Sequence, residues 1–242
     1  YRDDAQLNID QMMEEMYATT TASKSACPSP DDYMKSFEGA DNIIVVTITG
    51  TLSGSYNSAE IAKKIYLEEH PNANIHVIDS LSAGGEVDLL VRKLNHLVAE
   101  GLDFDQVLDA ITAYRAKTKL LFVLAKVDNL VKNGRLSKLV GTVVGLLNIR
   151  MVGEASKTGT LELLQKARGQ KKAIKAAFDE LIKAGYTGGH ITIAHRNNDK
   201  FIEQFSALIR EKFVQASIEV LPTSGLCSFY AEEGGLLMGY EI

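Results

Sequence analysis

A cluster of hydroxyl side chains follows a run of β-branched residues in the segment TITGTLSGSYNSAEIAKKIY, residues 47–66. Thr51, Ser53 and Ser55 lie where the apolar run ends and a helical pattern begins, with Gly54 between the two serines. In open α/β sheets, ligands bind beyond the carboxyl ends of the strands, where a helix N-terminus offers free N–H groups and a positive dipole end. The segment therefore suits one modest anion such as a carboxylate. The alternative is that the serines cap the helix and the glycines serve the turn.

One arginine lies in a tight turn between two predicted helical stretches, in the segment KNGRLSK at residues 132–138. The guanidinium of Arg135 can pair bidentately with a carboxylate or a phosphate. The alternative is a surface arginine, or one paired with an acid of the fold, because surface ion pairs are common and weak.

The sequence lacks the patterns of several other kinds of site. It has no Gly-Lys dipeptide, hence no GxxxxGK[ST] phosphate loop, and no GxGxxG after a strand. The five histidines form no i, i+3 or i, i+4 pair on a predicted helix, and there is no GxSxG elbow. We therefore expect no metal, no cofactor and no catalytic residues.

Composition narrows the class of protein. The chain has 242 residues, is 45% hydrophobic and carries a net charge of −5, so nothing suggests a nucleic-acid or anionic-membrane partner. Its apolar runs are far shorter than the ~20 residues of a membrane span. Cys27 and Cys227 lie far apart without metal or CxxC spacing, which favours free thiols in a reducing cytoplasm. We expect a cytoplasmic monomer.

Hydrophobic periodicity predicts strands that alternate with helices, which indicates an α/β fold. The expected strands lie at 42–49, 74–80, 119–127, 190–196 and 217–222, with two more around a turn at Thr158–Gly159. The expected helices lie at 8–18, 29–37, 57–70, 86–101, 104–118, 127–133, 171–185 and 198–213. Residues 224–242 are a final glycine-rich segment with no element assigned. We place one α/β domain at 1–118 and a second at 119–242.

Several segments together resemble the DegV family of bacterial fatty-acid-binding proteins. TLSGSYNSA is similar to that family's LSGTYQSA motif, SACPSP at 25–30 to its TSQPSP loop, and KNGRLSK to its KGGRIS turn. VIDSLSAGGEVDLLV and KARGQKKAI also match family patterns in the right order, so the resemblance covers essentially the whole chain. The family begins with a strand and a TDS loop upstream of this start. The resemblance therefore implies that the first strand of the N-terminal domain is absent from this chain.

The resemblance implies two α/β domains that hold one long-chain fatty acid, with the carboxylate at the domain junction and the tail in a buried tunnel. Some members are the acyl-binding partner of a separate ATP-dependent fatty acid kinase, which phosphorylates the bound carboxylate for phospholipid synthesis. The resemblance thus implies that this chain is a lipid-binding protein without a nucleotide site. Its implied partners are a long-chain fatty acid and such a kinase.

The resemblance also implies which residues hold the carboxylate. Ser53 stands at the serine of LSG, Ser25 replaces the loop threonine and keeps its hydroxyl, and Arg135 matches the arginine of the GGR turn. The complete expected ligand-binding set is Ser25, Thr51, Ser53, Gly54, Arg135 and Tyr230.

The C-terminal segment departs from the family pattern. Tyr230 stands where the family has a histidine close to the carboxylate, and Glu232 and Glu233 replace a glycine and a proline. A tyrosine donates a hydrogen bond, but its neutral phenol, with a pKa of about 10, cannot supply the charge of a protonated histidine. The two glutamates would repel a carboxylate if they faced it. These changes bear on the kinase step more than on fatty-acid binding.

Estimates of the binding free energy indicate that the tail of a fatty acid contributes more to affinity than its carboxylate does. Each buried CH₂ contributes about 0.8 kcal/mol, so about fourteen methylenes give on the order of 11 kcal/mol, whereas a hydrogen bond to a charged group nets about 1.5–3 kcal/mol. The expected tunnel residues, which would otherwise be ordinary core, are Phe122, Val140, Val143, Val144, Leu147 and Ile149.

Two other functions remain open. One is an enzyme acting on a small anion, such as a phosphotransferase that uses the Ser/Gly turn, although the missing lysine argues against it. The other is a regulatory protein for which a lipid is an effector.

Overall fold

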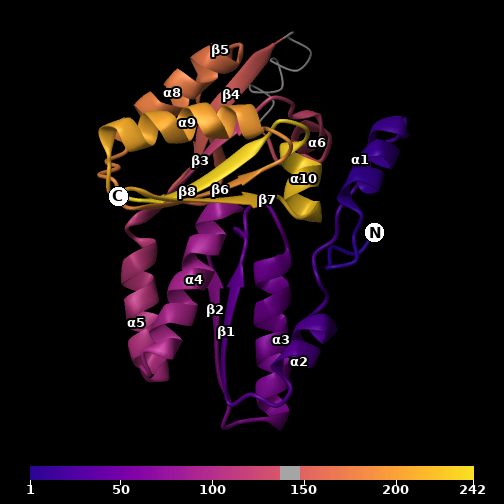
Figure 1. Ribbon diagram of the computed structural model, residues 1–242. Coiled ribbons are helices and arrows are strands. Elements are labelled where there is room, and N and C mark those ends of the chain that lie inside the picture. The colour runs from indigo at the N-terminus through magenta and orange to yellow at the C-terminus, as the bar shows by residue number, and fades with distance from the viewer. Residues whose placement is uncertain (137–147) are drawn as a thin grey trace.

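The computed structural model describes residues 1–136 and 148–242, which form two sheets (Figure 1). The small sheet pairs β1 (Asn42–Thr47) and β2 (Asn74–Asp79) in parallel. The large sheet has the strand order β5-β4-β3-β8-β6-β7. Its strands are β3 (Thr118–Leu124), β4 (Ile149–Ala155), β5 (Leu161–Arg168), β6 (His190–His195), β7 (Ser217–Pro222) and β8 (Leu236–Glu241). It is mixed, because β6 and β7 pair in parallel whereas β3, β4, β5, β6 and β8 pair antiparallel.

Helices cover both sheets (Figure 1). Those of the first half are α1 (Ile9–Ala18), α2 (Pro30–Phe37), α3 (Ser55–Glu69), α4 (Gly85–Ala99) and α5 (Phe104–Arg115). Those of the second half are α6 (Asp128–Lys132), α8 (Gln170–Lys183), α9 (Asp199–Lys212) and α10 (Gly225–Ala231). Apolar side chains of α2 and α3 pack on one face of the small sheet and those of α4 and α5 on the other. α1 lies beside α10, far from the small sheet (Figure 1).

Period-two alternation along the large sheet builds a core on each of its faces. Leu121 and Val123 of β3 pack in the first core with α8 and α9, whereas Phe122 packs on the opposite face. This second core consists of Leu120, Phe122, Leu124, Val127, Leu130, Leu136, Met151, Ala194, Ala231 and Leu237. The Phe122 ring packs against Gly153, where a Cβ would lie only 2.3 Å from the Phe122 Cζ atom. Gly153 lies at a register shift between β4 and β5.

The N-terminus of α4 approaches the backbone of the large sheet. A Cβ on Gly85 would lie 2.3 Å from the carbonyl oxygen of Thr192 in β6, and a Cβ on Gly239 in β8 would lie 2.2 Å from the backbone nitrogen of Glu86. Only residues without a side chain fit at such a distance. The two glycines therefore allow the helix that follows β2 to dock directly on the second sheet.

A buried carboxylate lies at the same contact. Glu86 is 5% exposed, and it accepts hydrogen bonds from the Ser82 hydroxyl at 2.5 Å and from the Thr118 hydroxyl at 2.8 Å. Ser82 follows β2 and Thr118 begins β3, so Glu86 links the two halves of the chain. Burial raises the pKa of Glu86, and the two hydroxyl donors offset part of that rise.

Several sequence expectations are confirmed within the described residues, and others need correction. The hairpin around Thr158–Gly159 is present as β4 and β5, with Gly159 at a positive φ of 79°. The strand expected at 42–49 ends at Thr47, and the helix expected from Asn57 already begins at Ser55. The C-terminal segment, to which no element was assigned, forms α10 and β8, and β8 is a central strand of the large sheet.

We predict that Glu86→Gln changes how stability depends on pH. A carboxyl whose folded-state pKa is raised contributes stability that is complete below its unfolded pKa of about 4.5 and is lost as pH rises through the folded pKa. The stability of the wild type relative to Glu86→Gln should therefore fall as pH rises above about 4.5. Denaturant unfolding of both proteins across this range measures the difference, and a difference independent of pH would contradict the prediction.

Candidate functional site

The turn between β1 and α3 leaves the N-terminus of α3 without a side-chain cap. The N-cap residue is Gly54, which has no side chain to accept from the first-turn N–H groups. The Ser53 hydroxyl accepts from the Ser55 backbone nitrogen at 3.2 Å and lies 2.9 Å from the Ser55 hydroxyl. Ser55 is the first residue of α3, so the partly buried Ser53 hydroxyl lies at the positive end of that helix. This arrangement suits an anionic group.

A second set of polar groups joins residues from three distant parts of the chain. The Ser25 hydroxyl lies 2.8 Å from the Tyr230 hydroxyl, across 205 positions of sequence. The Arg135 guanidinium carbon lies 5.4 Å from the centre of the Tyr230 ring, which is a cation–π distance. Arg135 Nε also donates to the carbonyl oxygen of Leu52, next to Ser53. Arg135 therefore contacts both the β1–α3 turn and α10.

The loop at residues 19–29, which carries Ser25, is held against α3 and the β1–α3 turn. The Ser58 hydroxyl of α3 donates to the carbonyl oxygen of Pro28 at 2.7 Å. A Cβ on Gly54 would lie 3.2 Å from the Cys27 sulfur, so the loop passes close to this glycine. From the other side, the Asn133 amide donates to the carbonyl oxygen of Ser23 at 3.1 Å.

Thr51 has a different environment from the rest of the expected set. Its hydroxyl donates to the carbonyl oxygen of Gly159 at 2.7 Å and lies 3.0 Å from the Thr49 hydroxyl. Gly159 is the hairpin turn between β4 and β5, where a Cβ would lie 2.1 Å from the Thr49 hydroxyl oxygen. The structure thus joins Thr51 to the hairpin and does not join it to Ser25, Arg135 or Tyr230.

The two glutamates that follow α10 have partners away from Tyr230. Glu232 is 2% exposed, and its carboxylate accepts from the Asn129 backbone nitrogen at 3.1 Å. Burial raises the pKa of Glu232. The Glu233 carboxylate lies 3.4 Å from the Asn197 amide nitrogen and 3.6 Å from the Arg196 Nε atom. The contacts of both carboxylates are therefore with residues other than Tyr230.

An apolar surface adjoins the polar groups. Tyr230 and Ile149 pack against the second core, in which Phe122 is 2% exposed. Of the residues expected to line a tail tunnel, Phe122 and Ile149 belong to this region. Val140, Val143, Val144 and Leu147 lie outside the described residues. Tyr230 therefore contacts the second core with its ring and Ser25 with its hydroxyl.

The side chains of Asp79 and His195 serve local structure. Asp79 accepts hydrogen bonds from the backbone nitrogens of Gly50 and Leu81, and so joins the end of β2 to the β1–α3 turn. His195 Nδ1 accepts from the Asn198 backbone nitrogen at 3.2 Å at the start of α9, and burial lowers its pKa. Sequence reasoning did not predict the contact of Asn133 with the loop at residues 19–29.

The described residues contain neither a metal-binding cluster nor a helix that could span a membrane. In residues 1–136 and 148–242, no three His, Cys, Asp or Glu side chains gather closely enough to hold a metal ion. Nor does any helix there have the length and apolar character needed to cross a membrane.

Residues 1–240 match the profile of the DegV family, described as uncharacterised proteins. A DegV domain-containing protein of Streptococcus gordonii is 77% identical over 99% of this chain and 85% of its own length. The chain belongs to the DegV family. Its fold is thus the α/β fold of DegV proteins, with one parallel and one mixed sheet.

Two solved structures of DegV-type proteins are very similar to this chain. One is the Streptococcus pneumoniae Fatty Acid Kinase (Fak) B3 protein loaded with linoleic acid, with a TM-score of 0.98 and 76% identity over 99% of this chain and 85% of that one. The other is a DegV family protein from Eubacterium eligens loaded with heptadecanoic acid, with a TM-score of 0.95 and 39% identity over 99% of this chain and 87% of that one.

We predict that Tyr230→Phe loosens the loop at residues 19–29 in this DegV protein. The change removes the hydrogen bond to Ser25 but keeps the ring that Arg135 covers, so it should cost about 1 kcal/mol of stability. Hydrogen exchange of residues 19–29 should become faster. The control is Tyr66→Phe, which removes a hydrogen bond to Phe37 elsewhere and should leave exchange of that loop unchanged. Equal exchange of the loop in all three proteins would contradict the prediction.

Proposed function

We propose that this DegV protein binds one long-chain fatty acid, with its carboxylate at the junction of two α/β domains at 1–118 and 119–242. The observation that carries the proposal is the hydrogen bond between Ser25 and Tyr230, because it joins the loop before α2 to α10 beside Arg135 and the second core. The fatty acids in the two similar structures, at 76% and 39% identity, support the same ligand class.

The proposed head-group contacts combine neutral and charged donors. Ser25, Ser53 and Tyr230 supply hydroxyls, Arg135 supplies the positive charge, and the uncapped N-terminus of α3 adds partial positive charge. Gly54 and Thr51 shape the turn that presents Ser53. The carboxylate thereby gains charge-assisted hydrogen bonds at a place where water is partly excluded.

The proposed tail lies along the second core, starting from Tyr230 and passing Phe122 and Ile149. Val140, Val143, Val144 and Leu147 remain a sequence prediction for the rest of the tunnel. Burial of about fourteen methylenes gives on the order of 11 kcal/mol, so the tail supplies most of the affinity and the polar groups orient the acid.

We further propose that the protein is a non-catalytic, cytoplasmic monomer that presents its acid to a separate fatty acid kinase and needs no cofactor. The similar Streptococcus pneumoniae protein is a Fatty Acid Kinase (Fak) B3 protein, which supports the connection with a kinase. Here Tyr230 cannot supply positive charge, so Arg135, stacked on its ring, is the proposed source of charge beside the reacting carboxylate. No observation favours a phosphotransferase or a regulatory role over this function.

We predict that the double variant Ser25→Ala, Ser53→Ala binds fatty acid at least about tenfold more weakly, since each hydroxyl that bonds a carboxylate contributes about 1.5–3 kcal/mol. Displacement of a fluorescent fatty acid measures the affinity. The matched control is Ser29→Ala, Ser36→Ala, which removes two exposed hydroxyls that bond within α2 and should lower stability without changing acyl affinity. Unchanged affinity in the first variant would overturn the head-group assignment. Mass spectrometry of lipid extracted from the purified protein tests the ligand class independently.

We predict that Arg135→Ala slows acyl-phosphate formation by a cognate fatty acid kinase at least tenfold, with a smaller loss in Arg135→Lys, which keeps the charge but not the planar fork. Acyl affinity should fall less, because the tail dominates it. Single-turnover phosphorylation of the bound acid measures the rate. If Arg135→Ala alters neither the rate nor acyl affinity, Arg135 does not serve the head group.

A further inference from the structure

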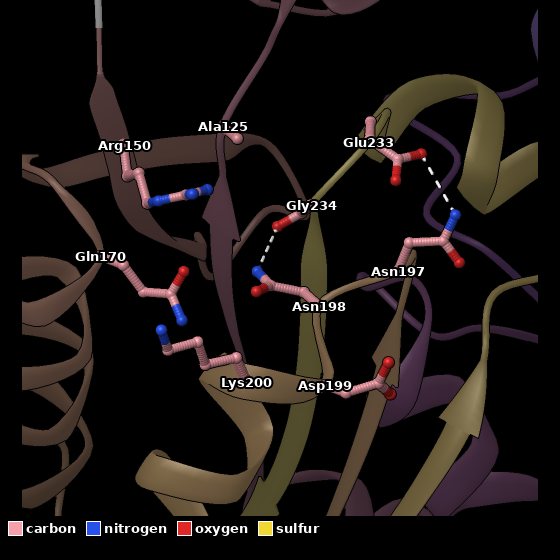
Figure 2. Close-up of a pocket in the computed structure, with 9 residues that line it drawn as sticks. All are labelled: Ala125, Arg150, Gln170, Asn197, Asn198, Asp199, Lys200, Glu233 and Gly234. Carbon is pink, nitrogen blue, oxygen red and sulfur yellow. Dashed lines mark hydrogen bonds between the residues drawn. The ribbon is translucent and has the colours of Figure 1, made fainter.

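A cavity of about 560 Å³ lies outside the proposed fatty-acid site, at the end of the large sheet where α8 and α9 begin. Its walls come from the end of β3, the start of β4, the N-termini of α8 and α9, and the turn between α10 and β8 (Figure 2). The residues that line it are Ala125, Arg150, Gln170, Asn197, Asn198, Asp199, Lys200, Glu233 and Gly234.

Three buried donor atoms of this cavity lack a hydrogen-bond acceptor in the part of the chain that the structure describes. They are Nε and Nη1 of Arg150 and Nε2 of Gln170. Burial lowers the pKa of Arg150, and no acid nearby counteracts this effect. A buried donor without an acceptor destabilises the folded protein, and more so when the donor is charged. Such a cluster is stabilised by a ligand that brings several acceptor atoms.

The cavity presents positive charge on one side. Figure 2 shows the nitrogen-bearing ends of Arg150, Gln170 and Lys200 gathered on the same side of the cavity. Gln170 and Lys200 lie in the first turns of α8 and α9, and α8 has no side-chain cap at Gly169. The first-turn N–H groups of these two 14-residue helices add partial positive charge and further donors.

The two acids of the cavity have their carboxylates directed elsewhere. The Glu233 carboxylate turns toward the Asn197 amide, from which it lies 3.4 Å away (Figure 2). The Asp199 side chain is 93% exposed and lies 3.8 Å from His195 Nε2. Arg150 and Lys200 therefore face the cavity without an acid between them, and a tetrahedral oxyanion offers enough acceptors for the unpaired donors.

We propose that this cavity binds inorganic phosphate or the phosphate group of a small soluble ester, with Arg150 as its charged anchor. Gln170 and Lys200 contribute further donors, and the cavity volume leaves room for an organic group attached to the phosphate. The site is separate from the proposed carboxylate site, but the turn at Glu233–Gly234 that borders it directly follows α10, which carries Tyr230.

Calorimetric titration of the fatty-acid-loaded protein with inorganic phosphate, at an ionic strength held constant with chloride, tests the proposal. The wild type should bind phosphate saturably, and the NMR signal of the Arg150 Nε–H group should shift in step with binding. Arg150→Gln should weaken binding at least about tenfold, because it removes the charged hydrogen bonds. Arg168→Gln is the matched control: it makes the same charge change at an exposed residue of the neighbouring β5 and should change binding less than twofold.

Gln170→Glu provides a second variant that keeps the size of the side chain. A negative charge in the first turn of α8 favours the helix but repels phosphate, so this variant should fold well and fail to bind. Fatty-acid affinity should be the same in all these variants. A failure of the phosphate proposal can therefore be distinguished from a failure of the proposed fatty-acid binding. The proposal would be overturned if the wild type showed no saturable phosphate binding at constant ionic strength in chloride. It would also be overturned if Arg168→Gln weakened phosphate binding as much as Arg150→Gln does.

Discussion

The close contact between α4 and the large sheet is the constraint on which the rest of the structure depends. Gly85 and Gly239 allow two backbones to approach to a distance that excludes any side chain, and Glu86 is buried beside them with two hydroxyl donors. This contact sets how the small sheet stands on the large one. The β1–α3 turn, which follows the neighbouring strand, is thereby placed opposite α10 and the segment that carries Arg135.

The polar groups at this junction are few, and each is bonded across long stretches of sequence. The Ser25 hydroxyl is hydrogen-bonded to the Tyr230 hydroxyl. Arg135 stacks on the Tyr230 ring and donates to the carbonyl oxygen of Leu52. Thr51 donates to the carbonyl oxygen of Gly159 in the hairpin turn. Hydrogen bonds of this kind contribute about 1 kcal/mol each, so their main effect is to orient. Under the proposed function, the apolar side chains next to Tyr230 supply the larger part of the binding energy for a ligand with a long tail.

The periodic elements were predictable because their signals are local. A continuous apolar run identified β3, the turn at Thr158–Gly159 identified the β4–β5 hairpin, and the helix expected at 29–37 is present as α2, with Ser29 as its cap. β8 was missed because glycines weaken a strand pattern. Gly239 is in β8 for a tertiary reason, since α4 approaches the strand there, and no local signal distinguishes that use of glycine from a loop.

The sequence by itself determined the chemistry of the candidate site: hydroxyls at Ser25 and Ser53, a single arginine at Arg135, and a phenol in place of an imidazole at Tyr230. It also determined the family, because several motifs occur in the right order. Only the tertiary structure decided which of these groups meet, that Glu232 and Glu233 bond elsewhere, and that Arg150 lines a second cavity. The physical reason is that motifs record residue types and local spacing, whereas contacts between residues a hundred or more positions apart are set by how the helices and sheets pack.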